Sequence, residues 1–332
     1  MRAVITGSAG FIGSRLAERL VADGWAVVGI DSFSSYYDPA DKQRNLAGLV
    51  DESRFEQVTS DVASDDIDAL LRDRPRVFHL AAQPGVRSSF GIGFGQYLHD
   101  NVLATQRLFE AARRAGCPRV VFASSSSVYG DAEQYPTPET VAPQPISPYG
   151  ITKLACEHLA VANARASGLD AVLLRFFTVY GPRQRPDMAF TAMLEALSRG
   201  GSFRLFGDGS AARSFTYVGD AVAATISAME RGRTGEIYNI GGGDEATMNH
   251  AIELAERISE RKLDVERVAA AAGDVRRTKA DVSKAAADLG WLPTTPLDAG
   301  MQAQWEWAAV ESRAPSWDAS RSRPAEPGSA RG

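Results

Sequence analysis

The sequence contains only two cysteines in 332 residues. Cys117 and Cys156 lie far apart, and neither belongs to a C-x-x-C pair or to another spacing typical of metal ligands. The pattern gives no indication of a disulfide framework or of a structural metal site. We therefore expect two buried or incidental thiols in a reduced protein that binds no metal.

A long hydrophobic run is also missing. No apolar stretch is long enough to span a bilayer, and residues 1–7 lead straight into a glycine turn, which leaves no room for a signal peptide. The 36 basic and 41 acidic residues give a net charge of −5, so no excess of positive charge points to nucleic acid or to a membrane surface. We expect a cytoplasmic globular protein with neither of these partners.

A glycine-rich turn follows the first expected strand. Residues 3–6 are apolar, Gly7, Gly10 and Gly13 come next, and a helical pattern follows. In this context Gly7 permits a tight turn, Gly10 lets the backbone approach a pyrophosphate, and Gly13 allows close packing of the helix. The helix N-terminus adds N–H donors for the phosphates. The spacing is G-x-x-G-x-x-G rather than G-x-G-x-x-G, and the alternative is a glycine turn without a ligand.

The second expected strand, residues 25–30, ends at Asp31. A carboxylate at this point can accept hydrogen bonds from both hydroxyls of an adenosine ribose and would repel a 2′-phosphate. This favours NAD over NADP. The alternative is an ordinary surface aspartate in a loop.

Further apolar runs near residues 55–59, 77–82, 119–123 and 171–177 predict more buried parallel strands. The expected fold class is α/β, with a Rossmann-type doubly wound parallel sheet and a smaller α/β C-terminal lobe that binds substrate. We expect residues 1–175 to form the dinucleotide-binding domain. Residues 176–310 form mainly the second lobe, with some segments returning to the sheet, and residues 311–332 form a disordered tail. His79 is expected to be a hydrogen-bonded core residue rather than a base.

Tyr149 and Lys153 lie four residues apart, a spacing that puts both side chains on one face of a helix. A lysine there can hold a cofactor ribose and lower the pKa of the tyrosine, so that the tyrosine becomes a proton acceptor. Such a pair recurs by chance, and it carries weight here because a dinucleotide site precedes it. Arg87, beyond the carboxyl end of a strand, suits a carboxylate or phosphate. Gly91, Gly93 and Gly95 follow no strand and predict only a flexible loop.

These motifs together resemble the extended short-chain dehydrogenase/reductase superfamily: the glycine turn, Asp31, the serines before residues 128–130, and Tyr149 with Lys153. The resemblance runs from Met1 to about Ala303. Residues 175–182 and 207–218 are similar to its nucleotide-sugar branch, and residues 36–39, 80–87 and 183–189 most resemble UDP-glucuronate 4-epimerases.

The resemblance implies a reaction and a set of contacts. Tyr149 would take the proton of the sugar 4-hydroxyl while hydride passes to NAD, Lys153 would bind the nicotinamide ribose, and Ser125 would contact the 4-oxygen. The implied cofactor contacts are Gly7, Gly10, Phe11, Ile12, Gly13, Asp31, Ser32, Asp61, Val62, Leu80, Ala81, Ala82, Gln83, Asn101, Ser124, Tyr149, Lys153 and Phe176. The implied substrate contacts are Pro84, Gly85, Val86, Arg87, Ser125, Ser126, Ser127, Tyr149, Thr178, Arg185, Met188, Phe206, Arg213, Tyr217 and Arg276.

The resemblance leaves the substrate open. Relatives that decarboxylate UDP-glucuronate carry a glutamate where this chain has Ser127, which favours simple epimerisation to UDP-galacturonate. Ser126, Ser127, Thr178 and either Arg185 or Arg87 are expected to hold the carboxylate. Pro84, Ser32 and Ser34 depart from the family pattern without removing a catalytic group.

The alternatives are a 4-epimerase of a neutral UDP-hexose or UDP-N-acetylhexosamine, a UDP-glucuronate decarboxylase, or an NAD-binding scaffold without activity. A scaffold would have no need of Ser125, Tyr149 and Lys153 together. The family also implies a homodimer, formed through the two long helices near Asn101 and Tyr149.

Overall fold

The computed structural model describes residues 1–243, 245–270, 273 and 275–311. The tail expected over residues 311–332 lies outside the described residues except for Glu311, which ends the last helix.

The centre of the molecule is a seven-stranded parallel sheet, which confirms the predicted fold class. Its strand order is β11-β6-β5-β4-β1-β2-β3, so the chain reverses direction across the sheet between β1 and β4. Loops that leave these two neighbouring strands turn to opposite sides, and the crevice at the carboxyl ends is where ligands bind in such sheets. The strands are β1 (Arg2–Thr6), β2 (Ala26–Asp31), β3 (Phe55–Thr59), β4 (Arg76–His79), β5 (Val120–Ser125), β6 (Ala171–Phe176) and β11 (Ile237–Ile240).

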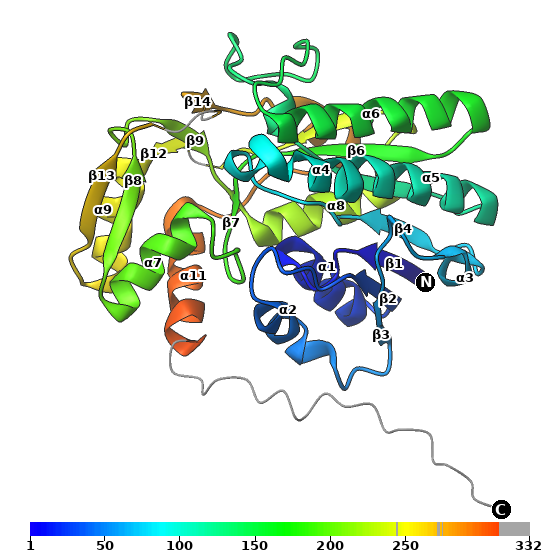
Figure 1. Ribbon diagram of the computed structural model, residues 1–332, viewed down its shortest axis with the longest axis horizontal. Coiled ribbons are helices and arrows are strands. Elements are labelled where there is room, and N and C mark those ends of the chain that lie inside the picture. Colours follow the sequence, from blue (N-terminus) through cyan, green and yellow to red (C-terminus); the bar gives the residue numbers. More distant parts are fainter. Residues whose placement is uncertain (244, 271–272, 274, 312–332) are drawn as a thin grey trace, which may run out of the picture.

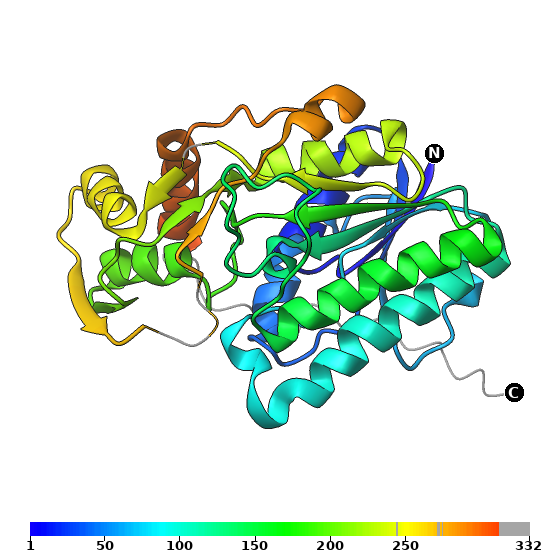
Figure 2. The ribbon, with the colours of Figure 1, turned by 90° about the horizontal axis from the view of Figure 1, so that it is seen from above.

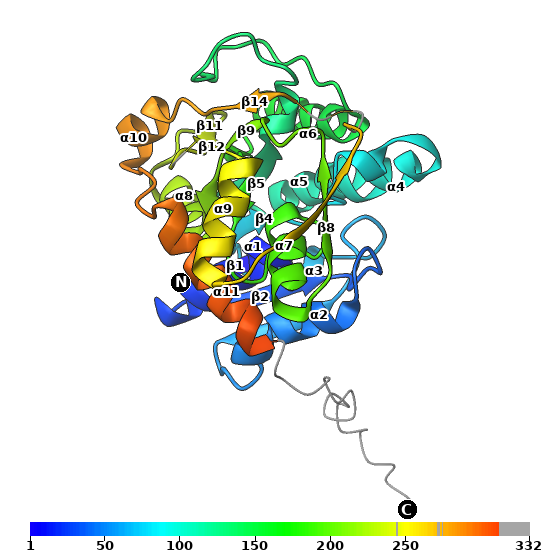
Figure 3. The ribbon, with the colours of Figure 1, turned by 90° about the vertical axis from the view of Figure 1, so that its left-hand side faces the viewer.

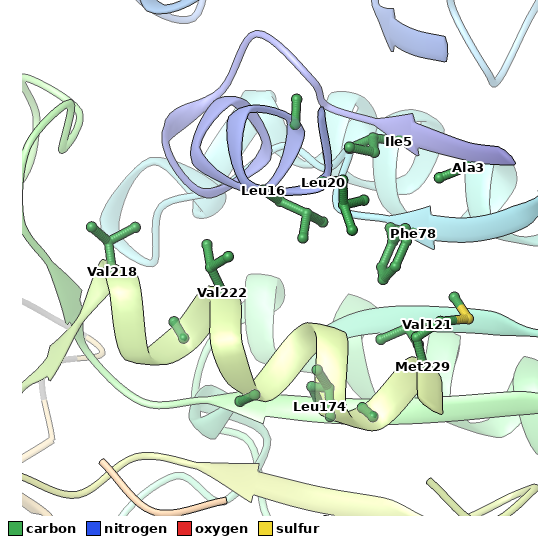
Figure 4. Packing of buried hydrophobic residues seen from close by; sticks show 14 of the residues in the cluster. Ala3, Ile5, Leu16, Leu20, Phe78, Val121, Leu174, Val218, Val222 and Met229 are labelled. Atoms are coloured by element: carbon green, nitrogen blue, oxygen red, sulfur yellow. The ribbon is translucent and has the colours of Figure 1, made fainter. Parts of the chain in front are cut away.

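Helices cover both faces of the sheet (Figure 1). One face packs against α1 (Phe11–Ala22), α8 (Val218–Arg231) and α10 (Ser283–Leu289). Figure 4 shows apolar side chains of α1 and α8 meeting those of the sheet strands in this cluster. The other face packs against α3 (Asp68–Leu71), α5 (Ala104–Ala115) and α6 (Pro148–Ser167), and Figure 2 shows α5 and α6 side by side.

The smaller lobe has a separate hydrophobic core, and Figure 3 shows this lobe in front of the sheet. Its helices are α7 (Ala189–Arg199), α9 (Met248–Ser259) and α11 (Leu297–Glu311). Its strands pair in three short sheets: β7 (Val179–Tyr180) with β10 (Thr216–Tyr217), β8 (Ser202–Phe206) with β13 (Asp264–Val268), and β9 (Ala212–Ser214) with β12 (Glu245–Thr247) and β14 (Arg277–Thr278). Since β11 and α8 come from beyond residue 175, the sheet domain draws on both halves of the chain.

The segment after β4 differs from the prediction of a flexible loop followed by a regular helix. It forms η2 (Arg87–Ser89), η3 (Gly91–Gly93) and α4 (Phe94–Tyr97), so two of the three glycines lie in short helical turns and the third lies in α4. A π-helical turn, η4 (Leu98–Leu103), then leads into α5. The remaining short helices are α2 (Pro39–Asn45), η1 (Ala47–Leu49) and η5 (Ser126–Val128). Turns of the π type often occur at functional positions, and this one places Asn101 beside α6.

Candidate active site

A cavity of about 430 Å³ runs along the carboxyl edge of the sheet. It brings together almost every residue that the sequence assigned to the cofactor: Gly7, Gly10, Phe11, Ile12, Gly13, Asp31, Ser32, Asp61, Val62, Leu80, Ala81, Ala82, Gln83, Ser124, Tyr149, Lys153 and Phe176. Ten of the residues assigned to the substrate line the same cavity: Pro84, Gly85, Val86, Ser125, Ser126, Ser127, Tyr149, Thr178, Arg185 and Met188. The residues assigned to the cofactor and most of those assigned to the substrate therefore line one continuous space.

The glycine turn has the shape that a pyrophosphate site requires. Gly7 has a φ of 72°, which side-chain-bearing residues rarely adopt. A Cβ on Gly13 would lie 2.0 Å from the carbonyl oxygen of Gly7, so α1 packs against the turn more closely than any other residue would allow. Helix α1 begins at Phe11 without a side-chain cap, and the residues of its first turn line the cavity, where backbone N–H groups of a helix N-terminus favour an anion. The turn thus fits the diphosphate of a dinucleotide.

Asp31 ends β2 at the edge of the cavity and is almost fully buried. Its carboxylate accepts hydrogen bonds from the backbone N–H groups of Ala9 (3.2 Å) and Phe33 (2.8 Å). The Nζ of Lys42, on α2, lies 3.3 Å from Asp31 Oδ1 and forms a buried ion pair with it. Because Lys42 offsets part of the charge of Asp31, that aspartate by itself is a weaker barrier to a 2′-phosphate than the sequence suggested.

Lys42 was missed by the sequence analysis. It lines the cavity, donates to Ser34 Oγ (3.3 Å) and lies 5.4 Å from the ring centre of Tyr37. A signal for it was its position in a short helix capped by Asp38 and begun by Pro39, which follows the Asp31 loop directly. Its contact with Asp31 depends on how α2 folds back, which spacing does not reveal.

Tyr149 and Lys153 lie on α6, and Ser125 ends β5 opposite them. Ser147 caps α6 by accepting a hydrogen bond from the N–H of Gly150 (3.1 Å), which fixes where the helix begins. Ser125 Oγ accepts from the N–H of Ser127 and donates to Ser127 Oγ, both at 3.1 Å. The hydroxyl of Ser125 also lies close enough to Tyr149 to lower the pKa of that tyrosine. The structure therefore brings the three predicted catalytic residues to one end of the cavity.

Lys153 was predicted to lower the pKa of Tyr149, but it is not among the groups that shift this pKa in the structure. Burial raises the pKa of Tyr149, while the nearby hydroxyl of Ser125 and the charge of Arg185 act in the opposite direction. Lys153 Nζ donates to the carbonyl oxygen of Ala123 (2.9 Å) and lies 6.0 Å from the Tyr149 ring centre. Burial also lowers the pKa of Lys153 to about 8, so this side chain is still an ammonium group at neutral pH. That form can donate to a ribose hydroxyl.

Asn101 is buried and does not line the cavity. Its amide oxygen accepts from the N–H of Gln83 (2.7 Å), and its amide nitrogen donates to Gln83 O (3.1 Å) and Thr152 Oγ1 (3.0 Å). These bonds use the amide to hold the Gln83 loop against α6, so Asn101 supports the cofactor residues from behind. His79 is fully buried between the hydroxyls of Thr6 and Thr105, as expected for a core histidine.

Five predicted substrate residues lie outside the cavity lining. Arg87 stacks on Phe206, with its guanidinium carbon 3.8 Å from the ring centre, so the two contact each other across the lobes. Tyr217 packs against Tyr180 at 5.9 Å between the two cores. Arg213 lies on β9, and its side chain donates to backbone carbonyl oxygens. Arg276 comes just before β14, the strand paired with β9, and it is exposed.

Two negative findings concern the described residues alone. Across residues 1–243, 245–270, 273 and 275–311, no cluster of histidine, cysteine, aspartate and glutamate could hold a metal ion. In that same part of the chain, no helix is long and apolar enough to cross a membrane.

The doubly wound sheet has a glycine turn at its switch point, and Ser125, Tyr149 and Lys153 line the same cavity as that turn. This arrangement is typical of a dinucleotide-dependent enzyme. Residues 3–241 match the NAD dependent epimerase/dehydratase family. The chain belongs to this family.

Individual relatives are similar over almost their whole length. A Bacillus subtilis protein named uncharacterized UDP-glucose epimerase YtcB is 42% identical over 91% of this chain and 96% of its own. UDP-glucuronate 4-epimerase of Thermodesulfobacterium geofontis is 33% identical over 92% and 95%. The crystal structure of UDP-glucuronic acid 4-epimerase from Bacillus cereus, in complex with UDP-glucuronic acid and NAD, is 38% identical. It superposes with a TM-score of 0.91 over 94% of this chain and 100% of that one. The protein is therefore an NAD-dependent nucleotide-sugar 4-epimerase.

Proposed function

We propose that the protein interconverts UDP-glucuronate and UDP-galacturonate. The observation that carries this proposal is the sugar end of the cavity, where the hydroxyls of Ser126, Ser127 and Thr178 and the guanidinium of Arg185 line the same space as Tyr149. Hydroxyl donors and an arginine are the groups that recognise a carboxylate. The Bacillus cereus relative, whose structure contains UDP-glucuronic acid, supports the same assignment.

The chain's own residues move and hold one proton. The Tyr149 phenolate accepts the proton of the sugar 4-hydroxyl, Ser125 hydrogen-bonds the 4-oxygen, and the Lys153 ammonium donates to the cofactor ribose. NAD, held by the glycine turn, Asp31 and Lys153, would supply a reversible acceptor for the hydride of C4, so that no net oxidation would result. The 4-keto sugar turns in the cavity and presents its other face, after which Tyr149 gives the proton back to the 4-oxygen.

Retention of the carboxylate follows from the residues around it. A 4-keto uronic acid is a β-keto acid, which loses carbon dioxide readily. At the position where decarboxylating relatives carry a glutamate, Ser127 supplies a neutral hydroxyl whose oxygen accepts from Ser125. Four potential donors around the carboxylate stabilise its charge and oppose the transfer of that charge to the sugar ring. We therefore assign epimerisation without decarboxylation.

A neutral UDP-hexose is the second candidate, and one contact favours it. Arg185 forms a bidentate ion pair with Asp187, with distances of 2.9 and 3.0 Å, so part of its charge is already balanced within the protein. The relative YtcB is named for UDP-glucose.

Variants at the sugar end distinguish the two substrates. We expect Arg185→Ala and Thr178→Ala to lower kcat/KM for UDP-glucuronate by about 10–100-fold, the loss that follows removal of hydrogen bonds to a charged group. The value for UDP-glucose should change little. Both constants are measured by steady-state kinetics, with Arg114→Ala as a control because Arg114 pairs with Asp68 on the outer surface. Equal losses on both sugars, or no loss, would remove the support for an acidic substrate.

We also propose that the protein is a homodimer. Leu98 and Leu103 of η4 and Ile151 of α6 are about half exposed on two adjacent helical segments, and such apolar surface is typical of a face covered by a second copy. Sedimentation should show a dimer for the wild type and a monomer for the double variant Leu103→Glu/Ile151→Glu. A monomeric wild type at micromolar concentration would exclude this interface.

A further inference from the structure

Arg185 is held by a carboxylate that does not itself line the cavity. Asp187 Oδ1 accepts from Arg185 Nε (2.9 Å), and Asp187 Oδ2 accepts from Arg185 Nη2 (3.0 Å). Both residues lie in the segment between β7 and α7. Nε and Nη2 of Arg185 are thus bound to Asp187. A substrate oxygen can approach the remaining edge of the guanidinium, at Nη1. The ion pair therefore fixes which side of Arg185 faces a ligand.

Asp187 is in turn held from the facing loop of the sheet domain. The hydroxyl of Tyr36 donates to Asp187 Oδ2 (3.2 Å) and lies 3.4 Å from Ser88 Oγ, which lies 2.7 Å from the hydroxyl of Tyr97. The ring of Tyr97 lies edge-on to that of Tyr149, with 6.3 Å between the centres. Three loops that are distant in sequence thus meet at Tyr36, on the rim of the cavity.

We propose that Asp187 is a positioning residue for Arg185: with Tyr36 it fixes the guanidinium at the sugar end of the cavity and balances part of its charge. This rests on the proposed role of Arg185 in sugar binding. Two consequences follow when the carboxylate is removed. Arg185 loses its fixed orientation, so the substrate binds less tightly. Its charge acts more strongly on Tyr149, which favours the phenolate form.

The test compares Asp187→Asn with wild type in steady-state kinetics across pH. We expect KM for UDP-glucuronate to rise by about tenfold with little change in kcat, as for a misaligned charge-assisted hydrogen bond. The acid limb of kcat should move to lower pH, because the charge of Arg185 lowers the pKa of Tyr149 and Asp187 no longer opposes it. The other titratable groups near Tyr149 are Lys153 and Cys156 on α6 and Tyr97 on α4, and they are unchanged in this variant.

Three further variants separate positioning from a structural role. Asp187→Glu keeps the charge and should recover part of the KM. Tyr36→Phe removes only the hydroxyl that reaches Asp187, so it should raise KM in the same direction by a smaller factor. Asp68→Asn breaks a comparable bidentate pair with Arg114, far from the cavity, and should match wild type.

If Asp187→Asn has the KM and acid limb of Asp68→Asn, Asp187 does not position Arg185. If the wild type converts UDP-glucose and leaves UDP-glucuronate unchanged, the proposed substrate is wrong. The KM and pH comparison is then made with UDP-glucose, and an unshifted acid limb on that sugar would overturn the positioning role independently.

Discussion

Replacement of Tyr149 by phenylalanine is expected to lower kcat by about 10²–10⁴-fold, the usual contribution of a positioned proton-transfer group. The ring would keep its edge contact with Tyr97, and Lys153 would keep its bond to Ala123. Cofactor binding should therefore survive while proton transfer fails. The measurement is kcat for the nucleotide sugar together with the NAD content of the purified protein.

Tyr135→Phe provides a matched control for this variant. Its hydroxyl donates to the carbonyl oxygen of Arg277 and lies outside the cavity lining, so its loss should leave kcat unchanged. Near-normal turnover by Tyr149→Phe would show that another group carries the proton. Loss of NAD from that variant would show that Tyr149 acts through the cofactor site.

The second large effect concerns stability. Glu157 and Arg175 form a buried ion pair, with both side chains 3% exposed and bonds of 2.9 and 2.7 Å. Ser124 donates to the same glutamate (2.5 Å), and the guanidinium stacks on Tyr129 at 4.7 Å. Because the partner carboxylate would be left charged and buried, we expect Arg175→Met to reduce the free energy of unfolding by about 3–5 kcal/mol.

Chemical denaturation measures this loss, and two variants serve as controls. Arg114→Met removes an exposed arginine whose side chain is 49% accessible, so it should change stability little. Adding Glu157→Gln to Arg175→Met removes the orphaned charge and should restore much of the lost stability. A small effect of the single Arg175→Met variant would mean that water reaches the pair. In that case the pair would not be what holds α6, which carries Glu157, against β6, which carries Arg175.

Local spacing predicted the fold, and the residues it assigned to the cofactor lie together in one cavity except for Asn101. The glycine turn, Asp31 and the Tyr149–Lys153 pair each depend on a strand or helix whose period can be read over a few residues. Parallel strands bring their carboxyl ends to one edge, so separate motifs meet there once the strand order is known.

Contacts between loops could not be predicted from the sequence. Lys42 reaches Asp31 because α2 folds back over the cavity, and Tyr36 reaches Asp187 across 151 positions of the chain. No periodic pattern records such pairings. The same limit affected the pKa of Tyr149: helical spacing places Lys153 on the correct face, but the lysine bonds to Ala123 and burial dominates.

The small lobe shows the limit most clearly. Phe206, Arg213, Tyr217 and Arg276 were assigned to the substrate from family motifs, and the structure places all four outside the cavity lining. Tyr217 packs against both the core beneath α1 and α8 and the core of the small lobe, and Phe206 is stacked on Arg87. Their roles toward a uridine nucleotide remain predictions, because they depend on how the lobes pack.

Epimerisation of an acidic UDP-sugar with its carboxylate retained is a reaction that can be observed directly. The direct measurement is proton NMR of UDP-glucuronate incubated with the purified protein and NAD. We expect an equilibrium mixture with UDP-galacturonate and no release of carbon dioxide. A UDP-pentose product would contradict the role assigned to Ser127, and unchanged UDP-glucuronate with conversion of UDP-glucose would contradict the acidic substrate.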